Sequence, residues 1–416
     1  MRRRRDDRSQ QYLSDVVALL WPEPWRHHDI GAFRVGRRQR AHPRAAYVFP
    51  HTRRPRMLVP ADLREAAQML RRSGGNESPL RSALDGALVR VVKSPVFAHV
   101  PWPSLHMAAG NGPEDSIESY LHGVLEEPVR VGVLLGTPRP NQKPVLQLFD
   151  LEGRTVGYAK VGHTPATAEL VRREARALAQ LGSHELDGVV TPRLLHHGQW
   201  KGVDVVVMSS VSSGAGSTGV PREVELQAMR QVASFDGTRR EQLQLSSFWA
   251  RLRDDVQQVQ EPDFSERLTR AFLATEQAWG SVDVEFGAWH GDWAPWNMSH
   301  RRGLVEIWDW ERFDPDVPLG LDLVHLLAQA VRPSGPHFES QEDEFLASVP
   351  TALPRVGVAD HLSDLTLVLY LLEIGSRYAL AGPEGRTAQT TTRLSWVVSL
   401  LERLGPGGAA PLVASD

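Results

Sequence analysis

The sequence predicts an α+β protein in which a smaller β-rich part is followed by a larger α-rich part. Between residues 128 and 162, three short apolar runs, PVRVGVLLG, KPVLQLFD and TVGYAKVG, are separated by turn-like segments, a pattern typical of an antiparallel meander. Beyond residue 220, apolar residues recur mainly at helical spacing. The small residues of SSGAGSTG, at 212–219, predict a hinge between the two parts.

One helix and two further strands complete the β-rich part, which we place at 126–211. The segment TPATAELVRREARALAQLGS has its apolar residues on one helical face, with Thr164 or Thr167 as the cap and Gly182 as the stop. TPRLLHHGQW and VDVVVMSSV follow as strands. The sequence therefore predicts a small lobe with a five-stranded sheet and one helix.

The α-rich part, 212–416, is predicted to consist of helices interrupted by one strand and one hairpin. VEFGAWHGD has strand character, and NMSHRRGLVEIWDW predicts a hairpin turned at Arg302 and Gly303. Helical periodicity is found in GLDLVHLLAQAV and near residues 222–233, 240–259, 264–279, 361–380 and 388–404.

The first 125 residues form an additional N-terminal extension whose role the sequence leaves open. Residues 60–73 have helical periodicity with Asp62 as a cap, and residues 87–100 have the β-branched character of a strand. This extension could be a substrate cap, an oligomer surface or a separate domain. The sequence does not indicate an oligomeric state.

Composition excludes several classes of protein. The chain of 416 residues has no cysteine, which excludes disulfides, thiolate metal sites and cysteine nucleophiles. Its most apolar segment, 365–380, contains Glu373 and Arg377 and therefore predicts a buried helix instead of a membrane span. The N-terminus has the charge of an export signal but not the apolar stretch. We expect a cytoplasmic protein without a membrane partner.

Basic residues are distributed unevenly along the chain. Residues 1–60 hold 14 Arg against five acidic residues, a balance of +9, and since the whole chain carries −3, the remainder carries −12. This basic segment is either a solvated arm or a contact surface for an anionic partner. No nucleic-acid partner is expected, because no zinc-finger spacing, helix-turn-helix pattern or aromatic-basic repeat accompanies the charge.

Lysine is rare: the 47 basic residues comprise 43 Arg and only four Lys, at positions 93, 143, 160 and 201. A lysine retained in such an arginine-biased chain marks a position where a compact ammonium group serves better than a planar guanidinium group. Each of the four is therefore a candidate binding residue.

Two short motifs place three oxygen-bearing side chains close together. In HGDWAPWN, Asp292 and Asn297 are five residues apart on a loop formed by Gly291 and Pro295, and Asp309 of IWDWE follows at the far end of the predicted hairpin. Because a hairpin returns its second strand beside its first, all three side chains can face one small volume. Such a set of hard oxygen ligands suits Mg²⁺.

The combination of HGDxxxxN and a following xDWE resembles the aminoglycoside phosphotransferase family, the small-molecule branch of the two-lobe protein-kinase-like fold, over roughly residues 130–400. This resemblance implies that Asp292 is the catalytic base and that His290 braces the loop. It implies that Asn297 and Asp309 bind magnesium. Asp322, in GLDLVHLL, matches the acid that steadies the catalytic loop from a helix start.

The resemblance also implies an ATP-binding part in the small lobe. Lys160 in GYAKVG and Glu174 in LVRREARAL match the family's third-strand lysine and the glutamate of the next helix. Lys160 would hold the α- and β-phosphates and Glu174 would direct it, with Glu169 as the weaker alternative. Backbone groups of Ser209 and Val211, in VVVMSSV, would contact the adenine base.

The resemblance predicts an ATP- and Mg²⁺-dependent phosphotransferase acting on a hydroxyl of an aminoglycoside or other antibiotic, a sugar or an amino alcohol. A protein kinase is disfavoured, because LLGTPRPNQKP, at 134–144, has one glycine and two interior prolines where protein kinases have a glycine-rich loop. The alternative from another class is a nucleotide-binding pseudokinase or scaffold. Among the tryptophans near the loop, Trp293 and Trp296 are the candidates to face the substrate.

Overall fold

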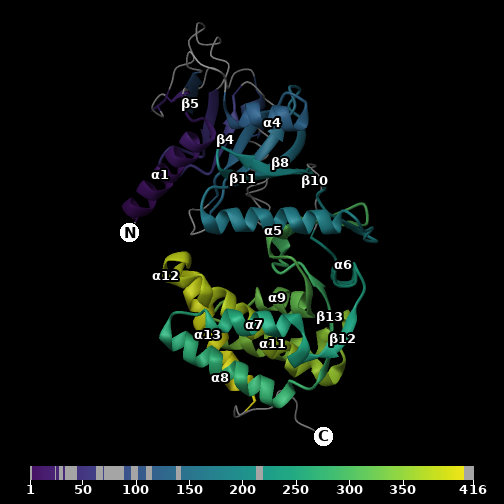
Figure 1. Cartoon of the computed structure of the whole chain (residues 1–416). Helices are drawn as coiled ribbons and strands as arrows, with labels where there is room; N and C mark the ends of the chain where they lie inside the picture. Colours follow the sequence, from purple (N-terminus) through teal and green to yellow (C-terminus); the bar gives the residue numbers. More distant parts are fainter. Residues whose placement is uncertain are drawn as a thin grey trace. The chain divides into compact units, whose positions relative to one another are not determined.

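The computed structural model describes residues 2–23, 25–27, 31–32, 45–61, 69, 89–94, 102–108, 115–136, 142–211 and 219–406. The chain divides into two compact units, one formed by Met1–Ala175 with Pro192–Gly214 and the other by Arg176–Thr191 with Ala215–Asp416. The first unit contains the large sheet, and the second contains most of the helices (Figure 1). The predicted α+β class, β-rich and then α-rich, is confirmed.

The five strands predicted for the small lobe are present and adjacent. The meander consists of β6 (Arg130–Leu134), β7 (Val145–Phe149) and β8 (Thr155–Gly162), each antiparallel to the next. β8 pairs with β11 (Val203–Ser209), which pairs with β10 (Leu194–Trp200) at the sheet edge.

The sheet continues into the first third of the chain. β4 (Met57–Pro60) pairs with β6 and links it to β3 (Ala45–Phe49) and β5 (Pro103–Ala108). The two-residue strands β1 (Arg26–His27) and β2 (Gly31–Ala32) both pair with β5. The five predicted strands are thus half of a ten-stranded sheet.

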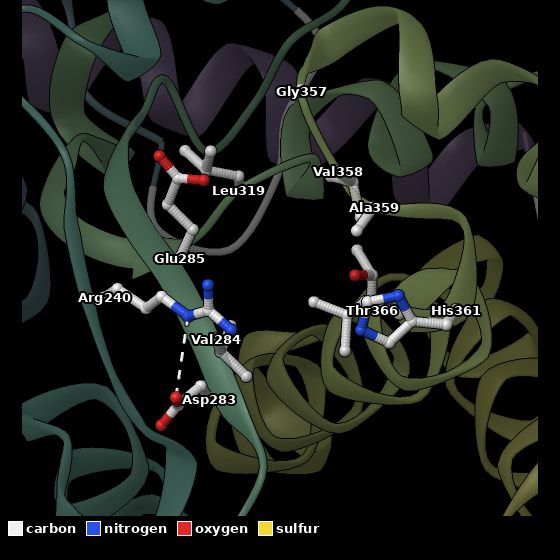
Figure 2. Close-up of a pocket in the computed structure, with 11 residues that line it drawn as sticks. Arg240, Asp283, Val284, Glu285, Leu319, Gly357, Val358, Ala359, His361 and Thr366 are labelled. Atoms are coloured by element: carbon white, nitrogen blue, oxygen red, sulfur yellow. Dashed lines mark ion pairs between the residues drawn. The ribbon is translucent and has the colours of Figure 1, made fainter.

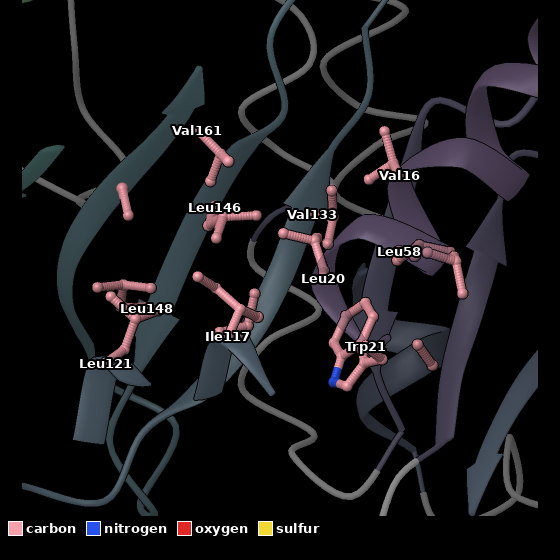
Figure 3. Packing of buried hydrophobic residues seen from close by; sticks show 14 of the residues in the cluster. Val16, Leu20, Trp21, Leu58, Ile117, Leu121, Val133, Leu146, Leu148 and Val161 are labelled. Carbon is pink, nitrogen blue, oxygen red and sulfur yellow. The ribbon is translucent and has the colours of Figure 1, made fainter. Parts of the chain in front are cut away.

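Two helices contribute to the main core of this unit, α1 (Arg2–Leu20) and α4 (Ile117–Leu125). Leu20 and Trp21 at the end of α1 belong to the same buried cluster as Ile117 of α4 and the strand residues Val133 and Leu146 (Figure 3). Ser116 caps α4 by accepting a hydrogen bond from the backbone N–H of Ser119.

The strand predicted at 87–100 is wrong for the residues that the structure describes there, since residues 89–93 are helical. Val89 and Val92 are buried in a second cluster with Phe49 and Phe149, whereas Val91 is 52% exposed. Buried residues that recur every three positions are typical of a helix. The packing of these valines into the cluster therefore overrides their β-propensity. The helix predicted at 60–73 lies outside the described residues except for residues 60, 61 and 69.

The predicted helix after β8 is α5 (Pro165–Leu181), which begins in the first unit and ends in the second. Both candidate caps take part at its start: the N–H of Thr167 donates to the hydroxyl of Thr164, and the N–H of Thr164 donates to the hydroxyl of Thr167. The predicted hinge at 212–219 lies outside the described residues except for residue 219.

Helices α11 (Ser363–Leu380) and α13 (Ala388–Leu404) form the centre of the second unit, and α11 is buried along most of its length. Around them lie α7 (Ser247–Gln257), α8 (Pro262–Trp279), α9 (Leu321–Ala328) and α10 (Phe338–Ala352). The remaining helices are α6 (Arg222–Ala233) and the short α12 (Gly382–Gly385). No helix within the described ranges is long and apolar enough to cross a membrane.

The helix predicted at 240–259 begins later than the periodicity indicates. β12 (Arg239–Gln242) pairs with β13 (Asp283–Trp289), and a short 3₁₀ turn follows before α7 starts. Ser246 fixes that start, since its hydroxyl accepts the N–H of Trp249. The cross-strand partners of β12 lie about forty residues away, beyond the reach of a local pattern.

The predicted hairpin is confirmed as β14 (Met298–Arg301) and β15 (Leu304–Ile307). Arg302 and Gly303 turn it with φ values of 52° and 81°, and a two-residue turn with both φ values positive matches the right-handed twist of the strands. β15 also pairs with β9 (Val189–Val190), and β16 (Asp314–Pro318) pairs with β13.

A substitution of Trp249, which stacks on Phe272, tests the packing of this core directly. The indole is fully buried, its ring centroid lies 4.1 Å from that of Phe272, and its Nε1 donates to Glu276. Trp249→Ala should lower the free energy of unfolding by about 3–5 kcal/mol, because it removes a large buried side chain. Leu245→Ala, at a side chain that is 66% exposed, should stay within about 0.5 kcal/mol of the wild type. Equal urea midpoints for the two variants would contradict this packing.

Candidate active site

A buried carboxylate holds the backbone of the HGD loop. After β13 ends, the N–H of His290 donates to Oδ2 of Asp322 at 2.7 Å, and the N–H of Gly291 donates to Oδ1 at 3.0 Å. Gly291 has a φ of 79°, and a Cβ there would collide with the carbonyl of Arg312, so glycine is required. Asp322 lies in the first turn of α9 and fixes the loop from that helix.

Burial dominates the titration of Asp322. The loss of solvent raises the pKa of this carboxyl group to about 6, although the charge of His290 and the two backbone N–H donors oppose the change. Near neutral pH, Asp322 is therefore an ionised acceptor that folding has removed from water at a cost in free energy.

His290 connects the loop to the end of the hairpin. Its ring is fully buried, its Nδ1 accepts the N–H of Asp292 at 3.2 Å, and its Nε2 lies 3.1 Å from the carbonyl oxygen of Trp308. Since a carbonyl oxygen can only accept a hydrogen bond, Nε2 is the donor in the contact with Trp308. The ring also packs edge-on against Trp310, with centroids 4.7 Å apart.

Asn297 contacts Asp292 directly. Its Nδ2 donates to Oδ2 of Asp292 at 2.9 Å and to the backbone oxygen of Asp292 at 3.0 Å. Asn297 is 4% exposed, whereas the side chain of Asp292 is 36% exposed. The carboxylate is thus held in place on one side and open to solvent on another.

Asp309 lies at the same end of the hairpin as Asn297. The N–H of Trp308 donates to the backbone oxygen of Asn297 at 3.0 Å, which continues the β14–β15 ladder up to Asp309. Asp309 has a φ of 72°, and its charge acts to raise the pKa of the Asp292 carboxyl group. The two carboxylates therefore interact electrostatically.

The pKa of Asp292 nevertheless lies below its usual range. Burial is the largest influence and acts to raise this pKa, but the hydrogen bond from His325 and the electrostatic interactions with the rings of His325 and His290 together outweigh it. Asp292 is consequently a carboxylate at neutral pH, the form that can accept a proton.

Several contacts at this loop involve residues that the sequence did not single out. Arg377 donates to the carbonyl oxygen of Gly291 at 2.7 Å and pairs with Glu373 at 3.0 Å, and Glu373 pairs in turn with Arg251 of α7. His325 lies 3.4 Å from Oδ1 of Asp292. Glu373 and Arg377 could have been found in the sequence as charged residues within an apolar helix. His325 could have been found from its position one helical turn after Asp322.

In the first unit, Lys160 and Glu174 form a buried ion pair. The Nζ of Lys160 on β8 lies 2.6 Å from Oε1 of Glu174 on α5, and the side chains are 9% and 0% exposed. Oε2 of Glu174 has no hydrogen-bond partner among the described residues. Since an unsatisfied buried acceptor costs about 1–3 kcal/mol, this arrangement is not optimised for stability alone. Glu169 pairs with Arg172 and Arg173.

The predicted adenine-binding segment is the end of β11. The N–H of Ser209 donates to the carbonyl oxygen of Arg193 at 2.9 Å, and its hydroxyl accepts the N–H of Arg193, also at 2.9 Å. Val211 is buried. Of the predicted phosphate loop, residues 137–141 lie outside the described part of the chain.

The tryptophans of the motif differ in exposure. Trp293 is fully buried and its Nε1 donates to Glu225 of α6 at 3.2 Å, so it packs inside the unit. Trp296 is 53% exposed between the buried residues Ala294 and Asn297. Of the two candidates to face a substrate, only Trp296 presents its indole to solvent.

A hollow elsewhere in the second unit contains none of the predicted site residues. It lies beside the first residues of β13, is open to solvent and has a cavity volume of about 120 Å³ (Figure 2). Arg240 and Asp283 form an ion pair at 3.6 Å on its wall, and His361 lies across from them. None of the residues predicted for chemistry lines this hollow.

No family model and no curated protein matches this chain. Among solved structures, it is similar to choline kinase LicA from Streptococcus pneumoniae, with a TM-score of 0.45 and 14% identity over 68% of this chain and 97% of that one. It is also similar to a thermostable mutant of aminoglycoside phosphotransferase APH(4)-Ia in complex with AMP-PNP and hygromycin B, with a TM-score of 0.44, 14% identity, and coverage of 68% and 97%. For amicoumacin kinase hAmiN, the TM-score is 0.41 at 13% identity, with coverage of 67% and 90%.

These three solved structures are of small-molecule kinases.

The raised pKa of Asp322 predicts a specific pH dependence of stability. Its folded pKa of about 6 lies above an unfolded value of about 4, so the folded state holds an extra proton between these values. The contribution of Asp322 to the free energy of unfolding should therefore fall by about 2–3 kcal/mol as pH rises through this window. The measurement is the free energy of unfolding of the wild type minus that of Asp322→Asn, obtained from urea unfolding at a series of pH values. This quantity should fall as pH rises from about 4 to about 6, and a rise would contradict the raised pKa.

Proposed function

We propose that this protein is an ATP- and Mg²⁺-dependent phosphotransferase that phosphorylates a hydroxyl group of a small molecule. The observation that carries the proposal is the state of Asp292: an ionised carboxylate, fixed through Oδ2 by Asn297, yet 36% exposed. A carboxylate that is oriented and accessible can bind an acceptor hydroxyl and take its proton.

Asp292 would orient the hydroxyl for in-line attack on the γ-phosphate of ATP. The hydroxyl oxygen would form a bond to the phosphorus, the bond to the ADP oxygen would break, and the hydroxyl proton would pass to the carboxylate. His290 supports this role because it holds the N–H of Asp292 and the carbonyl oxygen of Trp308 at once. Asp322 supports it by holding the backbone on which His290 lies.

Asn297 and Asp309 fit a magnesium site by their donor chemistry. The Nδ2 of Asn297 makes both contacts to Asp292, which leaves its amide oxygen as the atom for a cation. Asp309 adds a carboxylate close enough to influence Asp292, and its negative charge is offset when a cation binds. Mg²⁺ commonly takes only one or two carboxylates and completes its shell with water and phosphate oxygens. The metal would neutralise charge on the phosphates.

Lys160 would hold the α- and β-phosphates, and Glu174 would fix the direction of the ammonium group. Nζ lies 2.6 Å from Oε1 of Glu174, and an ammonium group has three N–H donors in all. Ser209 and Val211 are proposed to contact the base through backbone groups. For Ser209 the N–H is already bonded to Arg193, which restricts the contact to other backbone atoms of this segment.

The substrate classes that we propose are aminoglycosides or other antibiotics, sugars and amino alcohols. A pseudokinase scaffold is the alternative, and an intact set of Lys160, Asp292, Asn297 and Asp309 favours the enzyme, since a scaffold does not need all four.

A cytoplasmic location and the absence of nucleic-acid and membrane partners stay predictions from the sequence. The domain boundaries at 125 and 211 and the role of residues 1–125 also stay predictions.

Asp292→Asn tests the proposed base. We expect kcat to fall by about 10²–10⁴-fold, because the amide cannot take up the hydroxyl proton, while nucleotide binding stays measurable. Asp283→Asn is the matched control, since Asp283 lies at the other end of β13 with its side chain 51% exposed, and it should keep wild-type turnover. ADP release with a panel of hydroxylated compounds measures both. Retained phosphorylation in Asp292→Asn would rule out this assignment.

Lys160→Met tests the proposed phosphate contact. A charged hydrogen bond contributes about 1.5–3 kcal/mol, so kcat/KM for ATP should fall by about tenfold to a hundredfold. Because this change leaves Glu174 buried without its partner, the double variant with Glu174→Gln should recover stability but not ATP use. Lys201→Met, at an exposed ion pair with Asp115, is the control and should leave kcat/KM unchanged. An unchanged kcat/KM for ATP in Lys160→Met would show that Lys160 does not bind the phosphates.

A further inference from the structure

His325 lies in α9 one turn after Asp322 and is 3% exposed. Three polar groups surround its ring. The hydroxyl of Tyr370 on α11 lies 3.2 Å from Nδ1, the side-chain nitrogen of Gln329 lies 2.8 Å from Nε2, and Oδ1 of Asp292 lies 3.4 Å from Nε2. This imidazole therefore joins two buried helices to the carboxylate proposed as the base.

The surroundings of His325 favour a neutral imidazole. Burial lowers its pKa most strongly, and the positive charges of Arg377 and Arg393 act in the same direction, while the contact with Asp292 opposes them. A neutral imidazole has one N–H donor and one acceptor, so its tautomer decides what it can do for Asp292.

Tyr370 selects the tautomer. Burial raises the pKa of its hydroxyl, which consequently stays protonated and can donate to Nδ1 of His325. The proton of the imidazole is then on Nε2, directed at Oδ1 of Asp292. The side-chain Nε2 of Gln329 lies nearest to the ring Nε2, and the nitrogen and oxygen of an amide are assigned from such a network. With the amide turned over, its oxygen shares the Nε2–H of His325 with Oδ1 of Asp292.

The two carboxylate oxygens of Asp292 are thus contacted by two different partners, one on each oxygen. Asn297 donates to Oδ2 at 2.9 Å, and His325 faces Oδ1 at 3.4 Å, a contact of the length that catalytic hydrogen bonds often have before substrate binds. Donors on both oxygens restrict rotation of the carboxylate about its Cβ–Cγ bond. Each oxygen keeps a second lone pair, so the carboxylate can still accept the hydroxyl of a substrate.

We propose that His325 is a positioning residue: its Nε2–H donates to Oδ1 of Asp292 and, together with Asn297, sets the plane in which the carboxylate meets the acceptor hydroxyl. This inference rests on the proposed function, because it assigns His325 a part in the same reaction. His325 acts through Asp292 and does not itself touch the reacting atoms.

Paired substitutions test the role by kinetics. His325→Leu removes the donor at similar volume and should lower kcat by about tenfold to a hundredfold with the KM for ATP unchanged. His325→Gln carries an amide N–H at nearly the position of Nε2 and should recover most of that loss. His361→Leu, at an exposed histidine on the hollow of Figure 2, is the control and should match the wild type. Wild-type kcat in His325→Leu, or equal losses in the Leu and Gln variants, would overturn the proposal.

An NMR measurement tests it without any turnover. The ¹⁵N signals of the imidazole rings give the tautomer of each histidine, and the signals that disappear in His325→Gln belong to His325. We expect the Nε2–H tautomer, and we expect these signals to move in Asp292→Asn. An Nδ1–H tautomer, a cationic ring or signals unmoved in Asp292→Asn would overturn the proposal.

The two measurements separate this inference from the proposed function. If the NMR result is as expected but no hydroxyl compound is phosphorylated, the proposed function fails while the contact between His325 and Asp292 stands. If phosphorylation is observed and His325 carries its proton on Nδ1, the proposed function stands and the positioning role fails.

Discussion

The geometry of the candidate site depends on the carboxylate of Asp322, which accepts hydrogen bonds from two consecutive backbone N–H groups. These bonds, at 2.7 and 3.0 Å, hold His290 and Gly291 against the start of α9. With that backbone fixed, the ring of His290 can bind the N–H of Asp292 and reach the end of the hairpin at Trp308. A single buried acid therefore supports both the proposed base and, through His290, the end of the hairpin that carries Asp309.

Burying that acid is costly, and the surrounding charges show how the fold tolerates it. Arg377 donates to the carbonyl oxygen of Gly291 and pairs with Glu373, which pairs with Arg251 on α7. Burial acts to raise the pKa of Glu373, but the two arginines lower it below its usual range. Buried ion networks of this kind contribute little net stability, because desolvation offsets the attraction. Their effect here is to fix where the loop carbonyl lies.

The same helices that stabilise the unit also carry the polar groups of the loop. α9 supplies Asp322 and His325 one turn apart, and α11 supplies Tyr370 and Arg377 from a largely apolar helix. Because rigid elements position side chains more accurately than loops do, the precision of the HGD loop comes from its supports.

Much of the fold and part of the site could be predicted from the sequence, because the relevant signals are local. The hairpin turn at Arg302 and Gly303, the helix caps at Thr164 and Thr167, and the strand and helix that carry Lys160 and Glu174 all follow from short patterns.

What the sequence missed depends on residues far apart in the chain. β12 needs its partner β13, the helix at residues 89–93 depends on a buried cluster, and His325 shows its role only once α9 lies beside the loop. A buried histidine three residues after an acid has no pattern of its own, since most such residues are ordinary members of a core.

The most direct test of the proposed phosphotransferase is transfer of the γ-phosphate itself. The wild-type protein would be incubated with ATP labelled at the γ-position, Mg²⁺ and a panel of aminoglycosides, sugars and amino alcohols, and the products separated. We predict that label appears in a phosphate monoester of at least one hydroxyl compound, and that chelation of the metal prevents this. Tight ATP binding without transfer to any compound of a broad panel would contradict the proposal and favour the nucleotide-binding scaffold.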